Sequence, residues 1–73
     1  MSVNVLKTTR QDAKEYISSQ CKTWREKSSI SVENMSKLVG VSRQTIYDFE
    51  SGKIDSMSIL YFYLTLGVKL WKF

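Results

Sequence analysis

The side chains best suited to binding chemistry gather in one short stretch around Arg43 and Gln44. An arginine can donate two hydrogen bonds to guanine O6 and N7, and a glutamine can pair with adenine N6 and N7. Thr45 can offer a methyl group to thymine or a hydroxyl to phosphate, and Tyr47 can stack on a sugar or bond a phosphate. Asp48 fits less easily, because a carboxylate repels phosphate and can only accept hydrogen bonds. The stretch favours nucleic-acid recognition, with a plain solvated helix face as the alternative for each residue.

The composition offers little to catalysis or to metal binding. The chain has no histidine and one cysteine, whereas histidine is the commonest general base and a common zinc ligand. Gly40, Gly52 and Gly67 are spread too far apart to form a glycine-rich phosphate loop. We therefore expect no enzyme, no metal site and no cofactor.

Length and charge set the class of protein. The chain has 73 residues and a net charge of +4, which indicates one small domain with a moderate attraction to nucleic acid or an acidic surface. The longest apolar run, Ile59 to Leu64, is far shorter than the roughly 20 residues that cross a bilayer. The lone Cys21 cannot form an internal disulfide, and nothing at the N-terminus is typical of a signal peptide. These features favour a cytoplasmic protein without a membrane segment.

The apolar spacing predicts helices, preceded by an arm at residues 1–7 and forming one domain over residues 8–73. Thr8 and Gln11 fit a capping box at the start of a first helix that runs to about Lys27. One face of this helix is expected to be buried, with the apolar residues Ala13, Tyr16, Ile17, Cys21 and Trp24.

Two short helices are expected next, and their connection is the most informative feature of the sequence. Ser31 and Ser42 are good N-caps, and Gly40 allows the left-handed turn between the two helices. Ile46 and Phe49 would point back at the preceding helix. This spacing is typical of a helix-turn-helix, which leaves the outer face of its second helix free to enter the DNA major groove, about 12 Å wide.

A fourth helix is expected over residues 57–66, capped by Asp55 or Ser56 and ended by Gly67, with a C-terminal strand favoured over a frayed helical turn. This helix is apolar nearly all round, so one face would need a cover. A second copy is the expected cover, with a larger intramolecular core as the alternative. The expected dimer interface comprises Tyr61, Phe62, Leu70, Trp71 and Phe73.

The segment from Ser31 to Gly52, with its Gly-Val-Ser, central Ile and Glu-Ser-Gly, resembles the Cro/CI-type helix-turn-helix of the lambda-repressor-like or XRE family. The resemblance extends over residues 16–70 and implies a compact all-α fold of four or five helices that binds operator DNA as a dimer. The sequence departs from the family pattern at two positions. Val32 stands where the family often has a bracing glutamine, and Ser36 stands where alanine is usual.

The resemblance also implies roles for individual residues. The base-reading start of the recognition helix would be Ser42, Arg43 and Gln44, and contacts to the DNA backbone would come from Ser31, Ser51 and Lys53. Glu50 would be structural and would pair with Arg25.

The expected function is that of a sequence-specific transcriptional regulator of a phage or mobile element, a dimeric repressor that binds a palindromic operator in double-stranded DNA. The alternative is a protein-binding module, such as an antitoxin that grips a toxin or an inhibitor. It is favoured by residues 31–55, where three basic residues stand against four acidic ones.

Overall fold

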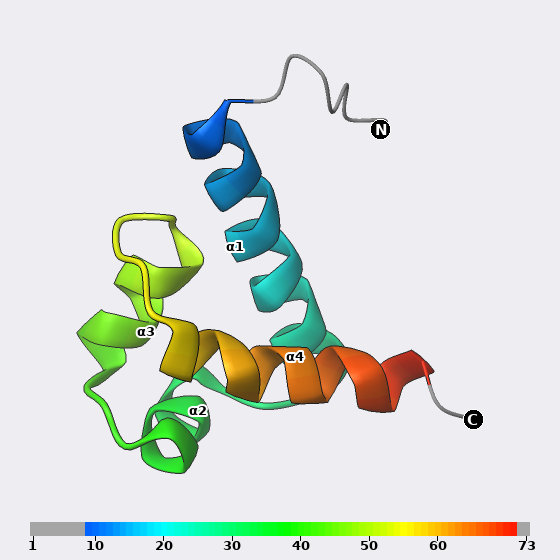
Figure 1. Cartoon of the computed structure of the whole chain (residues 1–73). Coiled ribbons are helices and arrows are strands. Elements are labelled where there is room, and N and C mark those ends of the chain that lie inside the picture. The colour runs from blue at the N-terminus through cyan, green and yellow to red at the C-terminus, as the bar shows by residue number, and fades with distance from the viewer. Residues whose placement is uncertain (1–8, 72–73) are drawn as a thin grey trace.

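Four helices build the fold in the computed structural model, which describes residues 9–71 (Figure 1). They are α1 (Arg10–Lys27), α2 (Val32–Val39), α3 (Arg43–Glu50) and α4 (Met57–Trp71). The two short helices α2 and α3 pack on each other, and α1 lies against α3 and α4. The predicted all-α fold is confirmed, and its arm at residues 1–7 lies outside the described residues.

The first helix begins one residue later than predicted. Thr9 is the N-cap: its hydroxyl accepts the Asp12 amide N–H at 3.0 Å, and its own N–H donates to the Asp12 carboxylate at 3.4 Å. The prediction of a Thr8–Gln11 box was wrong, because the box is formed by Thr9 and Asp12; Thr8 lies outside the described residues, and Gln11 donates to Glu15 on the helix surface at 3.0 Å. A carboxylate at the third helical position also suits the positive end of the helix.

The turn between α2 and α3 has the predicted geometry. Ser31 and Ser42 accept the amide N–H groups of Asn34 and Thr45, at 3.0 and 3.1 Å. Gly40 lies between the helices with φ at +86°, a left-handed conformation that costs little only for glycine. Local hydrogen bonding therefore sets the start of each helix, and the left-handed Gly40 sets the turn between them.

The last helix continues where a stop and a strand were predicted. Ser56 caps α4 by accepting the Ile59 amide N–H at 3.2 Å, and the helix then runs through Gly67 to Trp71. A Cβ on Gly67 would lie 3.0 Å from the indole of Trp24, so the glycine lets α4 approach α1 closely and does not end the helix. The predicted strand was wrong: residues 9–71 contain none, and residues 68–71 form the last turn of α4.

The core lies where the four helices meet. Its buried apolar side chains are Cys21, Met35, Ile46, Phe49, Ile59 and Tyr63. The rings of Phe49 and Tyr63 stack with centroids 5.2 Å apart, which joins α3 to α4. The predicted contact of Ile46 and Phe49 with α2 is confirmed through Met35.

The buried face of α1 differs from the prediction. Its buried side chains are Ser18, Cys21 and Arg25, whereas Tyr16 and Ile17 are each 41% exposed. Small and polar residues occupy this face because the turn after α3 comes close: a Cβ on Gly52 would lie 3.8 Å from the Ser18 hydroxyl. Across residues 9–71 no helix is both long and apolar enough to span a bilayer.

Candidate nucleic-acid interface

The C-terminal end of α3 is anchored to α1 by an ion pair. Arg25 donates from Nε to Glu50 Oε2 at 2.6 Å and from Nη2 to Glu50 Oε1 at 3.1 Å. Its remaining nitrogen, Nη1, donates to the carbonyl oxygen of Ile30 at 2.8 Å. The pairing implied by the family resemblance is therefore present, as a two-point contact with both side chains largely buried.

Glu50 is also bound from α4. The Tyr63 hydroxyl donates to Glu50 Oε2 at 2.5 Å, so one carboxylate joins α1, α3 and α4. Burial raises the pKa of Tyr63, and the hydrogen bond to Glu50 raises it further, so the phenol stays neutral and remains a donor. The hydrogen bond to Glu50 likewise raises the pKa of Arg25, against the opposing effect of burial. These contacts fix the orientation of α3 relative to α1 and α4.

Tyr63 was not assigned this contact from the sequence. The available signal was general: a buried tyrosine hydroxyl needs a hydrogen-bond partner.

The first turn of α3 presents Arg43 and Gln44 to solvent, as predicted. The Arg43 guanidinium is 3.8 Å from the Glu33 carboxylate of α2. Gln44 donates from Nε2 to Asp48 Oδ1 at 2.9 Å. Tyr47 is 56% exposed on the same helix. The long polar side chains of this surface are thus free of the core and within reach of a ligand.

Ser42 and Thr45 are already occupied within the chain. The Ser42 hydroxyl accepts the Thr45 N–H, and the two side-chain oxygens lie 2.9 Å apart. Ser42 therefore serves first as the cap that sets the direction of α3, and Thr45 is only half-exposed. The residues left with uncommitted donors at the start of α3 are Arg43 and Gln44.

The start of α2 offers a second contact region beside α3. Ser31 is exposed, and the amides after it form the positive end of a helix, which suits phosphate. Glu33 also lies in this first turn, but it is 3.4 Å from Lys37 and 3.8 Å from Arg43, so two cations offset its charge.

A hollow of about 350 Å³ runs beside the outer face of α3. Its lining includes Ser51 and Lys53, which were predicted to contact the DNA backbone, and Lys22 from α1. Lys22 was not predicted from the sequence as a contact residue. The signal was its position three residues before Arg25, since residues spaced by three share a helix face.

Metal-ligand groups and the single thiol are further candidates for a functional site within residues 9–71. Residues 9–71 contain no group of three histidine, cysteine or acidic side chains that could hold a metal ion. Burial raises the pKa of the Cys21 thiol to about 12, and Glu50 adds to the shift. A buried, protonated thiol is a poor nucleophile.

The arrangement defines a class of protein. The two short helices α2 and α3 are joined by a tight turn. Arg25 of α1 anchors the second of them through Glu50, and its exposed first turn is polar. This arrangement is that of a helix-turn-helix DNA-binding unit. The family model described as Helix-turn-helix matches residues 22–59, more than half of the chain. The protein therefore belongs to this family, of Cro/CI type, whose members are DNA-binding transcription regulators. Searches of the curated proteins and of the solved structures found no significant match.

Proposed function

We propose that the protein is a dimeric repressor that binds a palindromic operator with the first turn of α3 in the major groove. The observation that carries this proposal is the exposure of Arg43 and Gln44 on a helix whose other face is held by Glu50. The two side chains match guanine and adenine edges. A bound repressor would block the polymerase at the operator, and the concentration of the protein would control how much of the operator is occupied.

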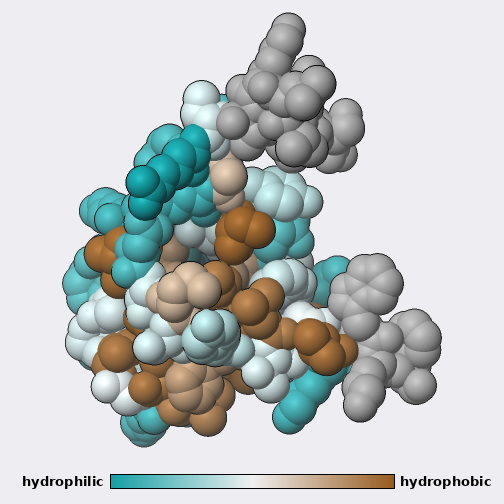
Figure 2. Space-filling view, in the orientation of Figure 1, coloured by the Kyte–Doolittle hydropathy of each residue, from teal (hydrophilic) through white to brown (hydrophobic). Residues whose placement is uncertain are grey.

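An exposed apolar stripe supports the dimer. Met57, Tyr61, Leu64 and Val68 follow one another at spacings of four, three and four residues along α4 and are all exposed. Such a spacing places them on one face of the helix, and Figure 2 shows hydrophobic side chains gathered over α4. A second copy related by a two-fold axis would bury the same stripe on both chains.

The residues predicted for the dimer interface differ in how exposed they are. Tyr61 lies in the stripe and is 60% exposed, while Phe62 and Leu70 are 38% and 37% exposed. The side chain of Trp71 and all of Phe73 lie outside the described part of the chain. Two copies joined through α4 would present two α3 helices to half-sites about 34–36 Å apart.

Selection of bound sequences from a random duplex library tests this proposal. The native chain is expected to select a palindrome whose half-sites are one helical turn apart. The double variant Arg43→Ala/Gln44→Ala is expected to lose the selected sequence while its unfolding midpoint stays unchanged. Arg10→Ala/Gln11→Ala is the matched control, since it removes the same two residue types from an exposed position on α1. Recovery of the native sequence by the α3 variant would disprove the assignment of base contacts.

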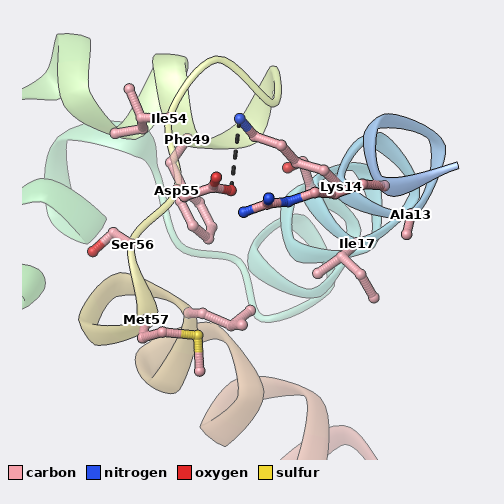
Figure 3. Close-up of a pocket in the computed structure, with 11 residues that line it drawn as sticks. Ala13, Lys14, Ile17, Phe49, Ile54, Asp55, Ser56 and Met57 are labelled. Atoms are coloured by element: carbon pink, nitrogen blue, oxygen red, sulfur yellow. Dashed lines mark ion pairs between the residues drawn. The ribbon is translucent and has the colours of Figure 1, made fainter.

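A protein-binding module remains the second candidate function, and a groove favours it. The groove has a volume of about 500 Å³ and lies between α1, the loop after α3 and the start of α4 (Figure 3). Its lining is mainly apolar, with Ala13, Ile17, Phe49, Ile54, Met57 and Leu60. Lys14 and Asp55 form an ion pair at its side, 3.6 Å apart. Such a groove suits an apolar segment of another protein, for example a toxin.

A salt titration of binding to random duplex separates the two candidates. A DNA-binding regulator loses affinity steeply as salt displaces it from phosphates. Absence of measurable DNA affinity at low salt would favour the protein partner.

A further inference from the structure

The contact between Gln44 and Asp48 restricts how the glutamine can read a base. The two residues are one helical turn apart on α3, and Gln44 Nε2 lies 2.9 Å from Asp48 Oδ1. An ionised carboxylate has acceptors only, so the amide must turn its NH₂ group, and not its oxygen, toward Asp48. The chemistry of the pair therefore sets the orientation of the Gln44 amide.

That orientation changes what the amide has left to offer. A free glutamine amide has two N–H donors and one oxygen acceptor. Once Asp48 holds one N–H, one donor and the oxygen remain. Adenine presents one acceptor, N7, beside one donor, N6, in the major groove, whereas guanine presents two acceptors, N7 and O6. The remaining pair of groups complements adenine and leaves one guanine acceptor unpaired.

We propose that Asp48 is a positioning residue that makes Gln44 select adenine over guanine. This inference rests on the proposed function, because it requires that the first turn of α3 enters the major groove. It also accounts for a carboxylate at a position where phosphate repulsion would otherwise disfavour one. Asp48 acts through Gln44 and needs no contact with a base.

The surroundings allow a carboxylate beside DNA. Asp48 lines the same hollow as Lys22 and Lys53, whose charges offset its own. Glu50 lines this hollow too, but its carboxylate is bound by Arg25 and Tyr63. A side-chain pair of this spacing is weak on a helix in water, and it strengthens where a bound duplex excludes water.

Binding to two duplexes tests the inference. One duplex carries the selected operator, and the other has guanine in place of adenine at the position whose preference is lost in Gln44→Ala. The native chain is expected to favour adenine by about 5- to 150-fold, the range of one bidentate contact. In Asp48→Ala this ratio is expected to fall about 2- to 10-fold. The fall should come mainly from tighter binding to guanine, because the second N–H is released.

Two further variants separate positioning from charge. Asp48→Asn keeps an acceptor oxygen without the charge, and it is expected to retain more of the adenine preference than Asp48→Ala. Glu26→Ala removes one exposed carboxylate from α1, and it is expected to leave the preference unchanged. The double variant Gln44→Ala/Asp48→Ala should show the same base preference as Gln44→Ala alone. Thermal unfolding of each variant checks that α3 remains folded.

The outcomes distinguish this inference from the proposed function. Equal changes in affinity for both duplexes in Asp48→Ala would show a charge effect only and overturn the positioning role, as would equal losses of preference in the Asn and Ala variants. A native chain that selects no operator would overturn the proposed function, and this inference with it. A native chain that selects an operator with guanine at the Gln44 position would overturn this inference alone.

Discussion

The inner and outer faces of α3 differ in what holds them. On the inner face, Ile46 and Phe49 are buried in the core, and Glu50 is bound from two other helices. On the outer face, Arg43 is paired with the exposed Glu33, and Gln44 donates a hydrogen bond to the half-buried Asp48. A helix of eight residues is not stable alone, so the inner face must supply its stability. Changes to the two faces should therefore have separate consequences, for folding and for recognition.

The largest expected effect is that of Glu50→Ala on the inner face. The substitution leaves the Arg25 guanidinium buried without its carboxylate, and breaking such a pair typically costs about 3–5 kcal/mol. A domain of this size has a total stability of about 4–11 kcal/mol, so the variant should be marginally folded or unfolded. Urea unfolding followed by circular dichroism measures the loss. Glu26→Ala, at an exposed position of α1, is the control and should change stability by less than about 0.5 kcal/mol. A loss below about 1 kcal/mol in Glu50→Ala would contradict the anchoring role.

A smaller effect is expected for Tyr63→Phe, which keeps the ring stacked on Phe49 and removes the hydrogen bond to Glu50. Hydrogen bonds to charged groups contribute about 1.5–3 kcal/mol, and the free energy of unfolding should fall by that amount. Tyr61→Phe, which changes an exposed tyrosine of the same helix, is the matched control and should have almost no effect. Equal stabilities of the two variants would show that the Tyr63 hydroxyl does not help to hold α3.

The same tyrosine adds a pH dependence. Because its pKa is raised in the folded protein, the unfolded chain ionises first as the pH rises. The stability associated with the neutral phenol is therefore complete below pH 10.0, the ordinary tyrosine value, and is lost as the pH rises above it. Native protein should lose stability more steeply than Tyr63→Phe in this alkaline range, as urea unfolding at several pH values would show.

The smallest effect on folding is expected from single alanine substitutions on the outer face. Arg43→Ala and Gln44→Ala remove exposed side chains with surface contacts only, so stability should change by less than about 0.5 kcal/mol. Thermal unfolding of each variant, compared with that of the native chain, measures this change in stability. A loss comparable to that of Tyr63→Phe would mean that the outer face also holds the helix, and the separation of the two faces would fail.

The accuracy of the sequence predictions depended on the range of the interactions involved. The bounds of α2 and the start of α3 were predicted correctly because Ser31, Gly40 and Ser42 act through hydrogen bonds and dihedral angles within a few residues. The Arg25–Glu50 pair came only from the family resemblance, since these residues are 25 positions apart. Gly67 was misread as a helix stop because its role depends on Trp24 of α1. Similarly, Tyr16 and Ile17 have the right apolar spacing, but each stays 41% exposed because no helix within residues 9–71 covers it fully.

The sequence by itself determined the helical class, the helix-turn-helix and the side chains on its exposed first turn, because caps, a left-handed glycine and apolar periodicity act locally. Only the tertiary structure decided that Tyr63 joins Arg25 in holding Glu50, that Lys22 lines the hollow beside α3, and that α4 continues past Gly67. Those features depend on how distant helices approach one another. Such approaches follow from the packing of the whole core and leave no periodic trace in a single segment.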